Sequence, residues 1–85
     1  MHTVKLYLDQ ARIGQTYRVV GIDCAYTGQE HYFYDIGIVA GELITVKIQG
    51  LFEMSNRVVM IGNSLFALRK DECECIVIEP VYGSL

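Results

Sequence analysis

The sequence predicts a mainly β fold, a small barrel of five to six short strands with one short helix inserted after the first long strand. Its 85 residues are enough for one hydrophobic core, so we expect residues 1–85 to form a single domain. Nine valines and nine isoleucines favour strand over helix, because β-branched side chains pack well on a pleated sheet. Such apolar strands also favour a barrel, which leaves no sheet edge exposed.

The first part of the chain predicts an arm, a strand and a helix. Residues 1–12 show only weak alternation of apolar and polar residues and are expected to be an arm without a definite element. Gly14 provides a turn before the apolar run 17–22, the first long strand. Residues 25–36 place apolar side chains at helical spacing, and Gly37 follows where helices commonly end in a left-handed conformation. This is the one helix that we expect.

The middle of the chain predicts a half-buried strand. Gly37 and Gly41 bracket a tight connection that leads into residues 43–49. Alternation along this strand sends three aliphatic side chains to the buried face and polar side chains to the other face. The three that we expect to be buried are Ile44, Val46 and Ile48.

A hairpin follows. The apolar run 58–61 is separated from the returning strand 65–69 by Gly62 and Asn63, a dipeptide that tolerates positive φ and suits a two-residue hairpin turn. A short polar turn over residues 70–74 then connects the hairpin to the last strand.

The closing strand, residues 75–78, is apolar on both faces. Pro80 ends it, because proline has no N–H to donate to a neighbouring strand. Residues 81–85 are expected to be a loose tail.

Charge and hydropathy limit the classes of function. Seven Lys and Arg against ten Asp and Glu give a net charge of −3, and the basic residues are scattered, whereas a nucleic-acid binder clusters them to displace counterions. No apolar stretch approaches the ~18 to 20 residues that span a bilayer, and the N-terminus lacks a signal-peptide pattern. We therefore expect a cytoplasmic protein that binds no nucleic acid and does not span a membrane.

The three cysteines, Cys24, Cys73 and Cys75, are expected to be reduced thiols, because their number is odd and one residue between two of them is too few for an unstrained bridge. Cys73 and Cys75 lack the spacing of a zinc site and have no second ligand pair. We interpret them as small apolar side chains. The alternative is a small metal-binding sensor or carrier of iron or zinc that uses Cys73, Cys75 and a histidine, with His31 as the candidate.

No arrangement of residues predicts catalysis. A nucleophile would need a base and an orienting group, and His31 lies on the predicted helix, where a solvated histidine is the better interpretation. The connection between Gly37 and Gly41 is too short for a phosphate-binding loop, and no Gly-Lys-Ser/Thr follows it. We therefore expect neither an enzyme nor a bound cofactor.

Three stretches of the chain, in this order and at this spacing, resemble the FeoA family. The resemblance extends from about Ile13 to Pro80. The stretches are 19–22 (VVGI), preceded by Gly14; 35–41 (DIGIVAG), which contains Gly37 and Gly41; and Ala67, Leu68 and Arg69 with the charged turn after them.

This resemblance implies an SH3-like barrel, a fold shared with the C-terminal domains of iron-dependent repressors. It also implies a non-catalytic accessory role in bacterial ferrous-iron uptake, beside the membrane GTPase permease FeoB, so that the chain meets a membrane only through this partner. The family often has basic residues before the Asp-Leu-Gly stretch, where this chain has Glu30, His31 and Tyr32. Docking through a basic helix is therefore not expected here.

Residues 50–56 connect two strands but contain three large apolar side chains, Leu51, Phe52 and Met54. One interpretation is that they fold back over an open end of the barrel. The other is a docking surface, for a partner domain or for a second copy in a homodimer, with Phe52 as its anchor. Tyr32 and Tyr34 on the helix form a second candidate patch, although tyrosines with solvated hydroxyls are also common on surfaces.

Overall fold

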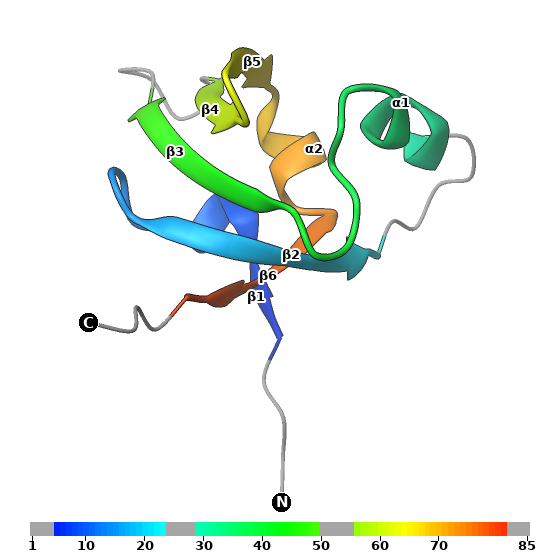
Figure 1. Cartoon of the computed structure of the whole chain (residues 1–85), viewed down its shortest axis with the longest axis horizontal. Coiled ribbons are helices and arrows are strands. Elements are labelled where there is room, and N and C mark those ends of the chain that lie inside the picture. Colours follow the sequence, from blue (N-terminus) through cyan, green and yellow to red (C-terminus); the bar gives the residue numbers. More distant parts are fainter. Residues whose placement is uncertain (1–4, 24–28, 50–55, 82–85) are drawn as a thin grey trace, which may run out of the picture.

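The described residues of the computed structural model are 5–23, 29–49 and 56–81, and they contain one antiparallel sheet in the order β1-β6-β2-β3-β4-β5 (Figure 1). The sheet curls like a barrel without closing, so β1 and β5 are its two ends. The elements are β1 (Leu6–Tyr7), the 3-10 helix η1 (Leu8–Gln10), β2 (Thr16–Ile22), α1 (Gln29–Asp35), β3 (Leu43–Gln49), β4 (Arg57–Ile61), β5 (Ser64–Leu68), α2 (Lys70–Cys73) and β6 (Ile76–Pro80).

The mainly β prediction is confirmed, and several local signals are confirmed with it. β3 has the predicted bounds, 43–49. The β4–β5 hairpin turns at Gly62 and Asn63, with Ile61 paired to Ser64. Gly62 has φ +59°, whereas Asn63 does not have positive φ, because only glycines do in the described chain. Positive φ at the first turn residue alone is the pattern of a type II′ turn.

Helix α1 ends as the sequence predicted, at a left-handed glycine. The Ile38 N–H donates to the Phe33 carbonyl at 2.8 Å and the Gly37 N–H to the Tyr34 carbonyl at 3.1 Å, while Gly37 has φ +94°. These two bonds form a Schellman motif, which satisfies carbonyls that the helix leaves without partners. The predicted helix covered residues 25–36; the described α1 is Gln29–Asp35, and residues 24–28 lie outside the described part of the chain.

The connection from α1 to β3 is bonded to the middle of β2. The Gly41 N–H donates to the Val19 carbonyl at 2.8 Å, and the Val19 N–H donates to the Glu42 carbonyl at 2.8 Å. Gly41 has φ +96°, a conformation that glycine adopts without steric cost. This pair of bonds fixes the position of the connection, and therefore of the end of α1, on the sheet.

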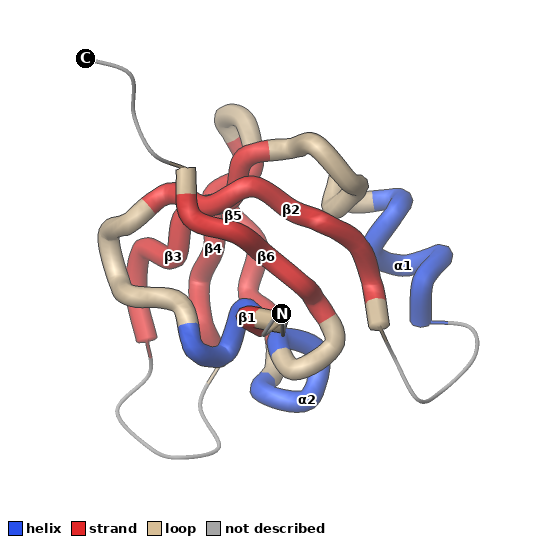
Figure 2. Tube along the Cα trace, turned by 90° about the horizontal axis from the view of Figure 1, so that it is seen from below, coloured by secondary structure: helices blue, strands red, loops and turns tan. Residues whose placement is uncertain are grey.

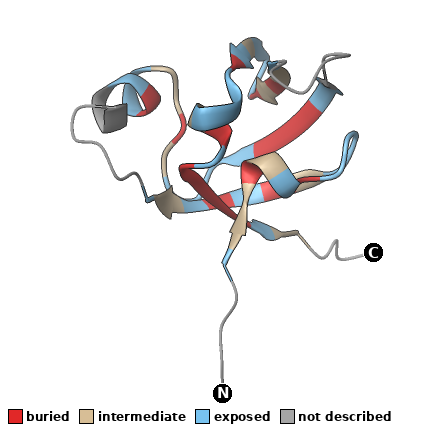
Figure 3. Cartoon of the chain, turned by 180° about the vertical axis from the view of Figure 1, so that it is seen from behind, coloured by how far each residue is buried: buried red, intermediate tan, exposed pale blue. Residues whose placement is uncertain are grey.

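One hydrophobic core fills the inside of the curled sheet, with contributions from the helices (Figure 3). Phe33 of α1, Leu8 of η1 and Cys73 of α2 are each fully buried, so every helical element has an anchor in this core. α1 follows the end of β2, whereas α2 packs beside η1 (Figure 2). The other large, fully buried side chains are Ile38, Ile44, Leu68, Ile76, Val19, Val46 and Val59.

The prediction that Ile48 is buried with Ile44 and Val46 was wrong. The pairing of β3 with β4 shifts by one residue between Val46 and Ile48, because a β-bulge interrupts the ladder there. The extra residue turns the following side chain to the other face, and Ile48 is 59% exposed while Ile44 and Val46 are fully buried.

Two segments have more regular structure than the sequence predicted. Residues 70–74, expected to be a polar turn, contain the second helix, α2, so the expectation of a single helix was also wrong. The arm 1–12 contains β1 and η1. β6 begins one residue later than expected and includes Pro80, which pairs with Tyr17 as the last residue of the strand. Among the described residues, no helix is long and apolar enough to cross a membrane.

Candidate partner-binding site

The two tyrosines predicted as a docking patch are exposed on α1. Tyr34 is 72% exposed and Tyr32 is 44% exposed, whereas Phe33 between them is fully buried. The Tyr32 ring lies against the Phe33 ring, with centroids 5.6 Å apart and the planes tilted by 55°. One buried aromatic therefore anchors this short helix, and two amphipathic aromatics face solvent beside it, which is the type of side chain enriched at protein interfaces.

The glycines of the DIGIVAG stretch hold this helix in place. Gly37 allows the Schellman end of α1, and the next residue, Ile38, is buried in the core. Gly41 allows the two bonds between the connection and Val19 of β2. Since both glycines act through the backbone, their role is to orient the surface that carries Tyr32 and Tyr34.

The stretch of Ala67, Leu68 and Arg69, which also resembles the FeoA family, has a structural role as well. Leu68 is fully buried at the end of β5, and Ala67 before it is exposed. Arg69 precedes α2, where its N–H donates to the Glu72 side chain at 2.7 Å and its Nε lies 3.5 Å from an Asp71 carboxylate oxygen. The Glu72 carboxylate thus satisfies a backbone donor at the start of α2, as in a capping box.

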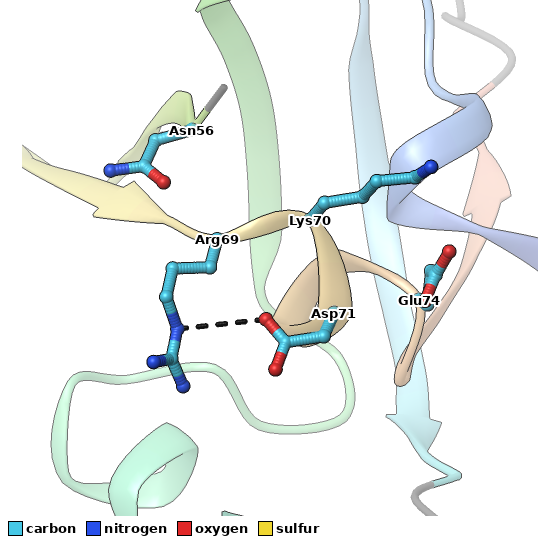
Figure 4. A pocket seen from close by; sticks show the side chains of 5 residues that line it. All are labelled: Asn56, Arg69, Lys70, Asp71 and Glu74. Atoms are coloured by element: carbon cyan, nitrogen blue, oxygen red, sulfur yellow. Dashed lines mark ion pairs between the residues drawn. The ribbon is translucent and has the colours of Figure 1, made fainter. Parts of the chain in front are cut away.

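A pocket of about 400 Å³ lies where β4 begins and α2 starts (Figure 4). Two basic and two acidic side chains line it together with one amide, and the Arg69–Asp71 ion pair belongs to its wall. The described lining contains no hydroxyl, thiol or imidazole; its reactive groups are the Lys70 amine and the Asp71 and Glu74 carboxylates. Sequence reasoning missed this pocket, because its local members in 69–74 looked like a strand end followed by an ordinary polar turn, and only folding brings Asn56 beside them. They are Asn56, Arg69, Lys70, Asp71 and Glu74.

The cysteines of the alternative metal site are in the core. Cys73 is fully buried, and burial raises the pKa of its thiol to about 12. The Cys75 thiol donates to the Asp71 carbonyl at 3.5 Å. Among the described residues, no three His, Cys, Asp or Glu side chains gather as metal ligands would. The His31 side chain lies outside the described part, so the combination of His31 with these thiols stays a hypothesis.

An exposed cluster near the N-terminus perturbs three ionisable groups. Asp23, just after β2, accepts hydrogen bonds from Lys5 Nζ at 3.1 Å and from the Tyr7 hydroxyl at 2.9 Å. These bonds lower the pKa of Asp23, chiefly through Lys5, and the bond to Asp23 raises the pKa of Lys5 and of Tyr7. All three groups are in solvent, so the cluster joins β1 to the end of β2 weakly.

The remaining predicted docking residues, Leu51, Phe52 and Met54, lie outside the described residues. They belong to the connection between β3 and β4. Their role as a docking surface therefore stays a prediction from the sequence.

Comparison with known proteins identifies the family. The family model for the FeoA domain matches residues 6–80, which include every described strand and helix. The chain belongs to the FeoA family. None of the curated proteins is similar enough in sequence to count as a match.

Several solved structures share this FeoA fold. A zinc complex of FeoA from Stenotrophomonas maltophilia, described as an SH3 domain protein, has a TM-score of 0.77 and 20% identity over 87% of this chain and 89% of that one. A FeoA-like protein from Clostridium acetobutylicum has a TM-score of 0.81 and 21% identity over 99% of this chain and 95% of that one. A manganese-dependent transcriptional repressor has a TM-score of 0.82 and 22% identity over 95% of this chain but 44% of its own. The predicted SH3-like fold is therefore confirmed. The expectation that barrel closure leaves no exposed sheet edge was wrong, because the described sheet curls without closing and ends at β1 and β5.

Proposed function

We propose that this chain is a non-catalytic, cytoplasmic accessory protein of bacterial ferrous-iron uptake, and that it acts by docking on the cytoplasmic region of a FeoB-type permease. The observation that carries the proposal is the match of the FeoA domain model to residues 6–80. The similar protein from Stenotrophomonas maltophilia is described as a candidate activating factor of ferrous iron transport, which supports a role exerted through a partner.

The described surface supports docking better than chemistry. α1 has the features of a small recognition element, because Phe33 and the Gly37 end fix its position while Tyr34 extends into solvent. A rigid helix loses little conformational freedom on binding, so its exposed aromatics can contribute most of their burial energy to affinity. In the mixed-charge pocket beside α2, the Arg69 guanidinium is paired with the Asp71 carboxylate, as in an ordinary surface ion pair.

Two patches are assigned to the docking surface. The first is Tyr32 and Tyr34, whose exposure the structure gives. The second is Leu51, Phe52 and Met54, assigned from the sequence, with Phe52 as its anchor. Each patch contains an aromatic side chain, and none of the five named residues is charged, so we expect docking to depend little on salt.

Ferrous-iron uptake in cells tests the proposal. Deleting this chain should change the initial rate of uptake of radioactive ferrous iron in a strain with the permease, and should have no effect in a strain without it. Tyr34→Ala and Phe52→Ala chains should reproduce the deletion at normal protein levels. Ile13→Ala is the matched control, because Ile13 is 54% exposed and precedes β2, whereas α1 follows that strand. A deletion effect that persists without the permease would contradict the proposal.

A further inference from the structure

The two ends of the open sheet are unequal. β1 has two residues and passes directly into η1, whereas β5 has five residues and lies at the outer end of the sheet beside β4 (Figure 1). Natural proteins protect such edges with charges, prolines, bulges or very short strands. β5 reads SLFAL and has no charge and no proline, and its five pairs with β4 run without a bulge. Among the described strands, β5 pairs only with β4, so its other edge can pair with a further strand.

The outward-facing backbone groups of β5 belong to Leu65 and Ala67. A two-residue hairpin turn closes on a hydrogen-bonded pair, here Ile61 with Ser64, and the hydrogen-bonded positions then alternate along the strand. Ser64, Phe66 and Leu68 thus face β4, and the two residues between them present N–H and C=O groups to the open edge. Within the described residues, the backbone N–H and C=O groups of Leu65 and Ala67 make no hydrogen bond to a loop or turn.

The side chains next to this edge are apolar on the outer face of the sheet. Leu65 is 61% exposed and shares a row with Met60 of β4. Ala67 pairs with Val58 of β4, and after the bulge in β3 the exposed Ile48 pairs with Val58 from the other side. These three side chains form a second row across the outer face. A strand that pairs with β5 would therefore continue two apolar rows as well as the backbone ladder.

We propose that β5 pairs antiparallel with β5 of a second copy of this chain, across a two-fold axis at Phe66. In this register Leu65 of each copy lies opposite Ala67 of the other. Each of these two pairs exchanges two N–H···O=C bonds, because both residues face the edge. The interface is isologous, as in most homodimers, and the strand that fills the edge is already present in this chain.

Charge also favours a second copy. The chain has a net charge of −3, and an isologous contact through acidic residues would repel. β5 contains no charge, and the first charged residue after it, Arg69, would lie opposite the neutral Asn63 of the second copy. A single strand pair buries less than the roughly 1,200 Å² of a stable interface, so the dimer should be weak and depend on concentration.

Sedimentation equilibrium from about 10 µM to about 1 mM covers weak association of this kind. Ala67→Pro removes an outward N–H and should raise the dissociation constant by about tenfold or more, because two of the four bonds between the copies are lost. Ala67→Ser keeps the N–H and is the matched control. Leu65→Lys should also dissociate the dimer, whereas Leu43→Lys, at a residue 46% exposed on β3, should not.

Hydrogen exchange gives a second readout that does not depend on variants folding. The amides of Leu65 and Ala67 should exchange more slowly as the concentration rises, while the Phe66 amide, already bonded to β4, should not change. A chain that stays monomeric throughout would overturn the proposal, and so would a dimer that Ala67→Pro leaves intact. Protection of the two amides only on adding the permease region would show that a partner strand occupies the edge, which would also overturn it.

Discussion

Arg57 holds the backbone carbonyl of Ala11, to which its Nη1 donates at 2.7 Å, and the same nitrogen donates to the Leu8 carbonyl at 2.9 Å. Arg57 begins β4, while Leu8 lies 49 residues earlier in η1 and Ala11 lies 46 residues earlier, just after η1. Among the described residues, β1 and β5 do not pair, so no strand ladder directly joins the two ends of the sheet. The Arg57 guanidinium therefore links the start of β4 to η1 across the open side of the curled sheet.

Replacing Arg57 by Met should lower the free energy of unfolding by about 2 kcal/mol, because a charged donor to two carbonyls is lost while the apolar part of the side chain is kept. Urea denaturation measures this. Arg12→Met is the matched control, since Arg12 is exposed in the turn before β2, and a surface change of this kind should stay within about 0.5 kcal/mol. Equal effects of the two changes would contradict the structural role of Arg57.

Gly37→Ala should destabilise the fold by about 1 to 2 kcal/mol, because φ is +94° there and an L-residue is strained in that region. The added Cβ would meet only Ile61 Cγ2 at 3.6 Å, an ordinary contact, so the cost arises from the backbone. Gly21→Ala has open space and no positive φ, and should be neutral or slightly stabilising. Thermal unfolding of the two variants compares them directly, and a destabilised Gly21→Ala with an unaffected Gly37→Ala would refute this assignment.

The bulge in β3 predicts a sharp contrast between two isoleucines on the same strand. Ile44→Ala should cost about 3 kcal/mol, because the side chain is fully buried and its loss leaves a cavity. Ile48→Ala should cost less than about 1 kcal/mol, since Ile48 is 59% exposed. Denaturant unfolding of both variants decides, and similar losses would mean that β3 alternates without the bulge.

Because Cys73 is buried, the free energy of unfolding should fall as the pH becomes alkaline. Its thiol has a pKa raised from 9.0 to about 12 in the folded chain, so the unfolded chain loses this proton first as the pH rises. The contribution of Cys73 to stability is full below pH 9 and is lost progressively between pH 9 and pH 12. We expect the wild-type chain to lose about 1 kcal/mol more than Cys73→Ala between pH 8 and pH 10. Parallel pH profiles of the two chains would show that the thiol ionises normally in the fold.

Local signals in the sequence predicted most of the strands. Alternation gave the bounds of β3, the Gly62-Asn63 dipeptide gave the hairpin, and Gly37 marked the end of α1. The side-chain face of Ile48 could not be predicted, because a bulge depends on the pairing with β4 rather than on β3 itself. Helix α2 was not predicted, because Arg69 is an unusual residue at the position before a helix. Glu72, three residues later, is the glutamate of a capping box and could have indicated the start of this helix.

Less of the candidate site followed from the sequence. The exposure of Tyr32 and Tyr34 agrees with their position on an amphipathic helix around Phe33. The bonds from Arg57 to η1 and the pocket between Asn56 and α2 join segments that are distant in sequence, so no local pattern indicated them.

A titration with the soluble cytoplasmic region of a FeoB-type permease, observed through the backbone amide resonances of this chain, tests the central claim most directly. We predict saturable shifts at Tyr32 and Tyr34 and at Leu51, Phe52 and Met54, with little change around β1. Tyr34→Ala should weaken the affinity by about 2 kcal/mol if Tyr34 is a hot spot, while Ile13→Ala should bind like the wild-type chain. A spectrum that does not change at any concentration of the permease region would contradict the claim.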